Sequence, residues 1–316
     1  MSHRLTPDPS PRLRRCLLAV PASSMKMMTK AATTDADAVF LDLEDAVSAG
    51  EKAAARLLVV TALREIDWSG TGKTISLRVN GLDTSWTYRD LVDVLEAAGD
   101  RIDTVILPKV GGPEDLYAAD CLITQIATAK GFAPPALEGL IETAAGAANL
   151  EAIARYNRDI GKPRLEALHF GAGDFAASIQ ARTVDIGGLN PDYPGDQFHA
   201  ILSRIVAACR ANGLVPMDSA FGDFGDPAGY DAAARRASSL GMAGKWAIHP
   251  AQIPLANAVF SPSEDEVTRA RGILAALDLA AAEGKGAAAY EGRMIDAANE
   301  RMARSVLAIH DRIKTR

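Results

Sequence analysis

The sequence predicts an α/β fold, a TIM (β/α)8 barrel followed by a C-terminal helical extension. Eight short apolar runs alternate with longer Ala-rich stretches of helical pattern in a chain of 316 residues. Eight such alternations in roughly 250 residues match the count and size of this barrel. An open, doubly wound parallel sheet is the alternative arrangement of the same elements.

The expected strands are continuous apolar runs, which is typical of strands that are buried on both faces of a parallel sheet. They are residues 15–20, 38–43, 74–79, 104–109, 137–142, 165–170, 214–219 and 245–249.

The expected helices follow the strands in alternation. They are residues 25–34, 51–66, 85–99, 112–131, 146–157, 196–213, 226–241 and 263–284. The clearest boundaries are Pro113 in a first turn and Gly131 after a last turn, because proline suits the start of a helix and glycine its end.

We expect residues 1–284 to form the barrel domain and residues 285–316 to form an extension. The extension starts with a Gly/Ala-rich link and continues with one more helix. On pattern alone it is either a surface helix or an arm that reaches a neighbouring subunit.

Composition excludes several classes of function. The net charge of −6 argues against general nucleic-acid binding. No segment approaches the roughly 18 apolar residues of a membrane span, and the apolar run 16–21 is shorter than the roughly 7 residues of a signal-peptide core. Cys16, Cys121 and Cys209 fit neither zinc nor redox spacing, so we expect buried thiols in the cytoplasm.

Two carboxylates stand at the ends of consecutive predicted strands. Glu142 ends the fifth strand and Asp174 follows the sixth. Because neighbouring strands lie roughly 4.8 Å apart, both side chains can reach one cation, and Mg²⁺ is usually held in this way. The alternative is that each carboxylate caps the following helix.

Three other polar residues stand at strand ends. Arg78 can hold a carboxylate or stabilise an oxyanion, or it can pair with the acids of residues 42–45, which would also orient it. Lys109 lies among apolar residues and could form a Schiff base. His249 is a structural hydrogen bonder or a base.

Several segments resemble the HpcH/HpaI aldolase and citrate lyase β-subunit superfamily. Within that superfamily the chain most resembles malyl-CoA and β-methylmalyl-CoA lyases. The resemblance runs from about Arg15 to the C-terminus. The superfamily resemblance lies in "VFLDLEDAV", "LRVNGLDT", "LIETAAG", "FGAGDFAAS", "GDFGDPAGY" and "GKWAIHPAQI". The resemblance to the lyases lies in "NGLDTSWTYRDLVDVLE", "ARRASSLGMAGKWAIHPAQIPLANAVFSPSE" and "GRMIDAA".

The resemblance implies the roles of the site residues. Glu142 and Asp174 would hold Mg²⁺, with Mn²⁺ as a substitute, and Arg78 would be the active-site arginine. Asp296 would be delivered by the extension into an adjacent subunit of a homotrimer or homohexamer. Contacts to the CoA substrate would fall on Ala19, Ser24, Lys30, Arg78, Gly173, Asp174, Ile248 and His249.

The implied reaction is the reversible cleavage of malyl-CoA, β-methylmalyl-CoA or citramalyl-CoA. Its products would be acetyl-CoA or propionyl-CoA and glyoxylate or another 2-oxoacid. Arg78 would face the thioester enolate oxygen. Asp296 would protonate the enolate carbon in cleavage, or remove a proton from it in condensation.

The chain departs from the family pattern in two places. Ala22 and Ser24 stand where the family often has an arginine. Either Lys26 or Lys30 meets the CoA phosphates instead, or the affinity for CoA is weaker. The segment 187–200 is shorter than its counterpart, which leaves the choice of substrate open. Three alternatives remain: a malyl-CoA thioesterase on the same scaffold, a Schiff-base aldolase using Lys109, and a non-catalytic barrel that binds CoA esters.

Overall fold

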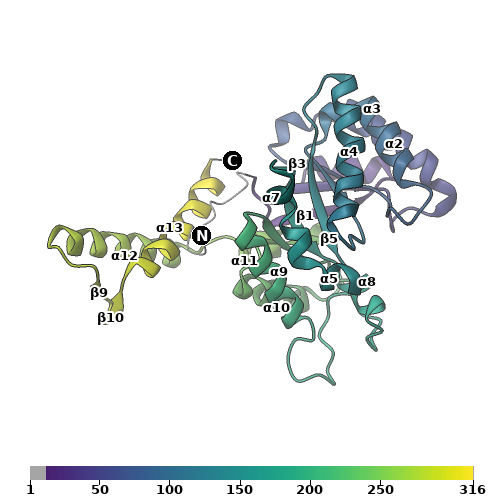
Figure 1. The fold of residues 1–316 in the computed structure, drawn as a ribbon. Coiled ribbons are helices and arrows are strands. Elements are labelled where there is room, and N and C mark those ends of the chain that lie inside the picture. Colours follow the sequence, from purple (N-terminus) through teal and green to yellow (C-terminus); the bar gives the residue numbers. More distant parts are fainter. Residues whose placement is uncertain (1–11, 316) are drawn as a thin grey trace. The chain divides into compact units, whose positions relative to one another are not determined.

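The computed structural model describes residues 12–315 and confirms the barrel (Figure 1). Eight parallel strands pair in chain order, and β1 pairs with β8 to close the sheet, which excludes the open alternative. Each strand lies where the sequence predicts one. The strands are β1 Cys16–Pro21, β2 Ala38–Asp42, β3 Thr74–Arg78, β4 Thr104–Leu107, β5 Ala136–Ile141, β6 Leu165–Phe170, β7 Val215–Asp218 and β8 Gly244–Ala247.

The chain divides into two compact units, residues 1–257 and residues 258–316, and the first contains the barrel. Its α-helices are α1 Met25–Ala32, α2 Lys52–Glu65, α3 Thr87–Ala98, α4 Pro113–Lys130, α5 Ala144–Ala148, α6 Leu150–Ala154, α7 Tyr156–Ile160, α8 Ala172–Ser178, α9 His199–Asn212 and α10 Pro227–Leu240. Helix α11, Ile253–Val259, spans the boundary. Single 3-10 turns are η1 Ala49–Glu51, η2 Ser69–Thr71, η3 Gly99–Arg101 and η4 Pro250–Gln252.

The helix ends follow from local chemistry. The α4 helix begins at Pro113, and Asp115 accepts hydrogen bonds from the N–H groups of Gly111 and Gly112, at 2.7 and 3.2 Å. It ends at Gly131, whose φ of 78° is accessible mainly to glycine. In Figure 1, α2, α3 and α4 lie side by side along one flank of the barrel.

The expectation of one helix over residues 146–157 is wrong, because three short helices, α5 to α7, occupy this region. The chain leaves helical geometry at Asn149, which ends α5 and precedes α6. Asparagine favours such breaks because its side chain competes for backbone hydrogen bonds. The short helices α8 and α11 were also not expected.

The second unit contains α12 Glu264–Ala282, β9 Ala288–Tyr290, β10 Arg293–Ile295 and α13 Ala297–Lys314. The expected flexible link is therefore a β-hairpin. Glu291 and Gly292 both have positive φ at its turn, as a two-residue hairpin turn requires. The hairpin packs on α12, where Gly272 leaves room for the Tyr290 hydroxyl: a Cβ there would lie 2.2 Å from it. The predicted extension, residues 285–316, is the later part of this unit.

The core of the barrel is filled by apolar side chains that point inward from the strands. They are Leu17, Ala38, Phe40, Ile106, Leu140, Ala167, Val215, Met217 and Trp246. Among the residues that the structure describes, no helix is long and apolar enough to cross a membrane. Cys16 and Cys209 are buried free thiols, as predicted, whereas Cys121 is partly exposed.

A buried set of polar side chains crosses the barrel interior, and we call it the interior network. Arg14 donates to Glu138 at 2.6 Å and to Glu166 at 2.8 Å. His169 Nε2 lies 2.7 Å from Glu138, and Trp246 Nε1 donates to His169 Nδ1 at 2.9 Å. Because an indole N–H can only donate, His169 Nδ1 accepts and its proton lies on Nε2. The network therefore fixes the orientation of the Trp246 ring.

Candidate active site

A cavity of about 360 Å³ opens at the carboxyl ends of the barrel strands. This is the end where TIM barrels place their chemistry. The predicted metal, catalytic and CoA-binding residues that line it are Ala19, Arg78, Glu142, Gly173, Asp174 and Ile248, and the acids Asp42 and Asp45 line it as well.

Arg78, at the end of β3, is held rigidly by acids of the preceding strand. Its Nε and Nη2 donate to Asp42 at 2.7 and 2.6 Å, and its Nη1 lies 2.6 Å from Glu44. The rings of Phe40 and Trp246 each lie 5.5 Å from the guanidinium. Burial alone would lower the pKa of Arg78, but the acids raise it above its ordinary value, so the side chain is charged. The prediction that these acids orient Arg78 is confirmed.

Glu142 directly follows β5 and is buried. One of its oxygens accepts the backbone N–H of Lys109 at 2.9 Å, which Lys109 presents from a left-handed conformation with φ of 53°. The capping role belongs to Thr143, whose hydroxyl accepts from Gly146 at 3.0 Å. The helix-cap alternative for Glu142 is therefore wrong.

Asp174 lies in the first turn of α8, whose N-cap is Gly171. Its side chain is 41% exposed and lines the same cavity as Glu142. Gly171 leaves space for the Glu142 carboxylate, because a Cβ there would lie 2.4 Å from its Oε2 atom. The two carboxylates of adjacent strands thus share one cavity, and the chain leaves room around them.

The protein does not fully stabilise the ionised form of Glu142. The pKa of Glu142 is raised to about 8, first by burial and then by the charges of Glu44 and Asp174. Among residues 12–315, no group of three or more His, Cys, Asp or Glu side chains could hold a metal. A two-carboxylate set suits Mg²⁺, which keeps several water or substrate oxygens. The donor set therefore fits this ion, because a bound cation would stabilise the ionised form of Glu142 that the protein itself disfavours.

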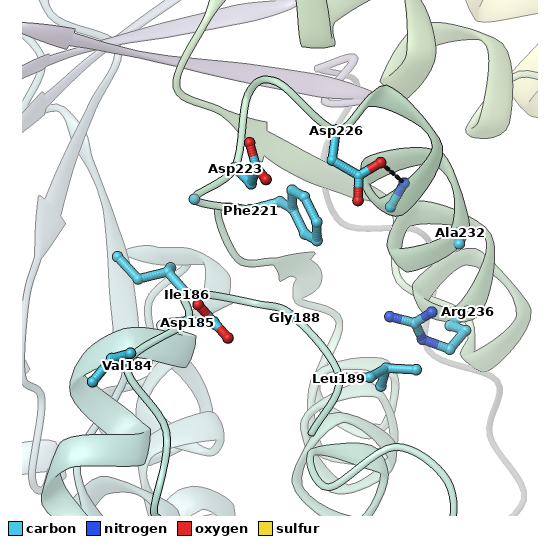
Figure 2. Close-up of a pocket in the computed structure, with 12 residues that line it drawn as sticks. Val184, Asp185, Ile186, Gly188, Leu189, Phe221, Asp223, Asp226, Ala232 and Arg236 are labelled. Atoms are coloured by element: carbon cyan, nitrogen blue, oxygen red, sulfur yellow. Dashed lines mark hydrogen bonds between the residues drawn. The ribbon is translucent and has the colours of Figure 1, made fainter. Parts of the chain in front are cut away.

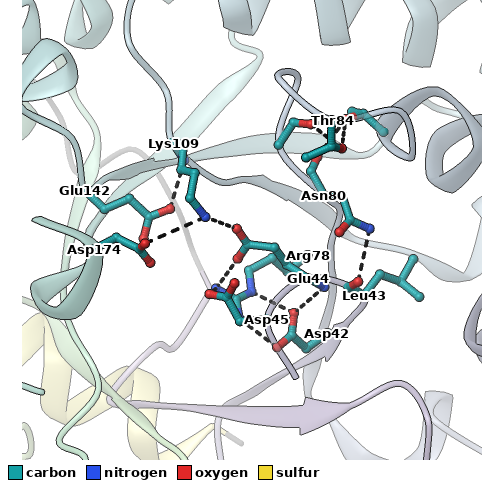
Figure 3. A network of polar contacts seen from close by, with 12 residues as sticks. Asp42, Leu43, Glu44, Asp45, Arg78, Asn80, Thr84, Lys109, Glu142 and Asp174 are labelled. Atoms are coloured by element: carbon teal, nitrogen blue, oxygen red, sulfur yellow. Dashed lines mark hydrogen bonds and ion pairs between the residues drawn. The ribbon is translucent and has the colours of Figure 1, made fainter. Parts of the chain in front are cut away.

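Lys109 lies between the carboxylate pair of Glu142 and Asp174 and the acids that hold Arg78 (Figure 3). Its ammonium group donates to Glu44 and lies 3.9 Å from Asp174. Burial alone would lower the pKa of Lys109, but the hydrogen bond and charge of Glu44 raise it above its ordinary value. A Schiff-base lysine needs a lowered pKa, so the structure argues against that alternative.

Three predicted CoA contacts do not line this cavity. Ser24 is the N-cap of α1, Lys30 is exposed in the last turn of the same helix, and His249 is exposed and stacked on Phe224 at 5.2 Å. They stand after β1 and β8, which are neighbours in the barrel. Their positions define one sector of the rim.

Asp296 belongs to the second unit, where it is the N-cap of α13. Its side chain accepts from Ala298 at 2.8 Å, and Asn299 accepts from its backbone N–H at 3.0 Å. The observed role of Asp296 within its own chain is thus to begin a helix.

Sequence reasoning missed the aromatic residues around Arg78. Phe40 and Trp246 lie in predicted strands that are apolar on both faces. Such strands show no alternation of polar and apolar residues, so the sequence does not indicate which side chains face the barrel interior. Ile186, which also lines the cavity, comes from a loop without any motif.

Comparison with known proteins agrees with this geometry. The HpcH/HpaI aldolase/citrate lyase family model matches residues 15–250, a range that contains all eight barrel strands. The chain belongs to this family. The second unit lies outside the matched range.

Relatives cover nearly the whole chain. An L-malyl-CoA/β-methylmalyl-CoA lyase of Cereibacter sphaeroides is 47% identical, over 97% of this chain and 98% of its own. A (3S)-malyl-CoA thioesterase of the same species is 34% identical over 93% of each chain. The crystal structure of the protein CitE from Mycobacterium tuberculosis with magnesium, acetoacetate and coenzyme A superposes with a TM-score of 0.76. That protein is 27% identical, over 96% of this chain and 100% of its own.

Proposed function

We propose that this protein is a Mg²⁺-dependent carbon–carbon lyase. It reversibly cleaves L-malyl-CoA, β-methylmalyl-CoA or citramalyl-CoA to acetyl-CoA or propionyl-CoA and glyoxylate or another 2-oxoacid. The observation that carries the proposal is one cavity that holds Arg78, Glu142 and Asp174 in a chain 47% identical to a relative of this name. We place the activity in the cytoplasm.

Glu142 and Asp174 would hold the ion, and Mg²⁺ supplies Lewis-acid polarisation of substrate oxygen atoms when it is bound. The residues around the pair prepare it for this task. The Lys109 N–H fixes one oxygen of Glu142, and Gly171 keeps the space beside the other oxygen free. Lys109 links Asp174 to Glu44, which limits the excess of negative charge.

Arg78 would stabilise the thioester oxygen, where negative charge develops when the carbon–carbon bond breaks. Its guanidinium is charged, and Asp42 holds it in place before substrate arrives. The flanking rings of Phe40 and Trp246 limit access of water. Donors that need no reorganisation during the reaction are the most effective ones.

Asp296 of a neighbouring subunit would exchange the proton at the carbon next to the thioester. In this proposal residues 285–316 complete an adjacent subunit's site within a homotrimer or homohexamer. The carboxylate is partly exposed.

The CoA moiety would follow the rim sector formed after β1 and β8. Ala19, Gly173 and Ile248 line the cavity, and Ser24, Lys30 and His249 stand further out. Lys26 and Lys30 are exposed cations on α1, which suits them to the phosphates of CoA.

A thioesterase is the second candidate, because a relative with that activity in its name is 34% identical over 93% of the chain. The two reactions differ in their products. Malyl-CoA should yield acetyl-CoA and glyoxylate from a lyase, but free malate and CoA from a hydrolase. Mass analysis of products after incubation with Mg²⁺ separates them, and a non-catalytic barrel that only binds CoA esters would leave malyl-CoA intact.

A further inference from the structure

A second cavity, of about 720 Å³, is shown in Figure 2, and it shares a lining residue with the active-site cavity. It is bounded by the loop 184–189, by the segment after β7 and by α10. Among the described residues that line these two cavities, Ile186 is the one that they share. Ile186 is 47% exposed, so neither cavity is closed off by other residues that pack over it. Ile186 is therefore the partition between the two cavities.

The backbone of the partition is fixed. Gly222 donates its N–H to the Ile186 carbonyl at 2.9 Å. Gly187 has a φ of 75°, and a Cβ there would lie 2.4 Å from the Ala220 carbonyl. A side chain at Gly187 would thus be excluded both by its conformation and by space. The loop can place Ile186 reproducibly because its neighbours anchor it.

The side chain of Ile186 lies close to the proposed metal site. A Cβ at Gly173 would lie 3.4 Å from Ile186 Cγ1, and Gly173 directly precedes Asp174. Any 2-oxoacid held beside Asp174 would present the substituent of its carbonyl carbon near this wall. An aliphatic wall restricts such a substituent by size alone.

We infer that Ile186 determines which 2-oxoacids the enzyme accepts, by limiting the substituent on the carbonyl carbon. This inference rests on the proposed lyase function. Removal of the side chain would join the two cavities and admit longer substituents. Leu189 and Phe221 offer these an apolar surface. The charged lining disfavours an anionic substituent, because Asp185, Asp223 and Asp226 outnumber Arg236. Arg236 itself lies 3.7 Å from Asp196. The class of added substrates is therefore 2-oxoacids with uncharged alkyl chains.

The test is the condensation of acetyl-CoA with glyoxylate, pyruvate, 2-oxobutyrate and 2-oxovalerate. In Ile186→Ala, the kcat/KM ratio of 2-oxobutyrate to glyoxylate should rise at least about tenfold, since one methylene is worth roughly 10–200-fold in such pockets. Leu189→Ala is the matched control, because Leu189 lines only the second cavity, and its ratio should stay within about twofold. Gly222→Ala should lower the ratio, because its Cβ would lie 3.2 Å from Ile186 Cβ and push it.

Calorimetric binding of the same 2-oxoacids to the Mg²⁺-loaded protein provides a readout without turnover. The affinity ratio of 2-oxobutyrate to glyoxylate should rise in Ile186→Ala as well. An unchanged ratio in both measurements would overturn the inference, whether or not the wild-type protein is active. A different result separates the two proposals. If the wild-type protein binds 2-oxoacids but condenses none, and the affinity ratio still rises in Ile186→Ala, the lyase proposal fails while the role of Ile186 in selecting 2-oxoacids holds. Ile186→Val, with a smaller shift in the same direction, serves if Ile186→Ala does not fold.

Discussion

Two buried glutamates four residues apart show how the same side chain serves structure and chemistry. Glu138 and Glu142, in β5 and at its end, are 1% and 2% exposed. Burial would raise the pKa of Glu138, but Arg14 and His169 lower it below its ordinary value. The pKa of Glu142 is instead raised to about 8 by burial and by Glu44 and Asp174.

The difference between them lies in their partners and in the adjoining space. The interior network gives Glu138 two partners of its own, and it adjoins packed side chains. Glu142 accepts one backbone N–H beside a cavity and faces other acids. The candidate site is marked by a buried carboxyl group that lacks a basic partner of its own among the described residues and adjoins open space, rather than by burial itself.

Removal of divalent metal should have the largest effect. It should affect the candidate active site and leave the interior network unchanged. EDTA should abolish turnover and added Mg²⁺ should restore it, because Glu142 and Asp174 would lose the ion that they hold. Far-UV circular dichroism should not change, since the interior network needs no metal. Full activity in EDTA would refute the metal site.

Glu138→Gln and Glu142→Gln should have opposite consequences. Loss of the Glu138 charge removes one of the two carboxylates paired with buried Arg14, which keeps Glu166, and should lower the free energy of unfolding by about 1–3 kcal/mol. Glu142→Gln should leave that free energy within about 1 kcal/mol of wild type, but should reduce turnover at least about 100-fold. Asp174→Asn should behave like Glu142→Gln. Urea denaturation and steady-state kinetics measure both quantities, and equal losses of stability in the two glutamine variants would break the distinction.

Arg78→Lys tests whether the fixed guanidinium acts on the reaction. Lysine cannot form the paired hydrogen bonds to Asp42, so kcat should fall about 10²–10³-fold. Arg14→Lys is the matched control in the interior network. It should lower stability while the folded enzyme keeps near-native turnover.

Asp296→Asn extends the test beyond the barrel. Turnover should fall at least roughly 100-fold if this carboxylate is the acid/base, and truncation after residue 285 should have the same effect. Glu300→Gln, one turn further along α13, should be neutral. Near-native rates in Asp296→Asn would remove it from the mechanism.

The smallest expected effect is on acid stability. The pKa of Glu138 is lower in the folded protein than in the unfolded chain, so its stabilisation is complete above about pH 4.5 and is lost as the pH falls. One such group contributes a slope of at most about 1.4 kcal/mol per pH unit. The unfolding free energy should therefore decline less steeply between about pH 4.5 and 3 in Glu138→Gln than in wild type. Equal slopes in urea titrations would contradict the assignment.

The sequence by itself determined the alternation of strands and helices, because apolar runs and helix-end residues such as Pro113 and Gly131 act locally. It also brought Arg78, Glu142 and Asp174 to one rim, since the ends of parallel strands in a closed barrel converge. The helix breaks at Asn149 and Arg155 and the hairpin turn at Glu291 do not follow from the sequence pattern, because their signals are weaker than the Ala-rich composition around them.

Only the tertiary structure decided which residues surround those groups. The inward phase of Phe40 and Trp246, the ion pairs of Arg78 and Lys109, and the position of Ile186 between two cavities all depend on contacts between distant segments. Strands that are apolar on both faces carry no periodic mark of which side faces inward. Closure of the barrel supplies that choice, because it gives each side chain its neighbours and each carboxylate its charge environment.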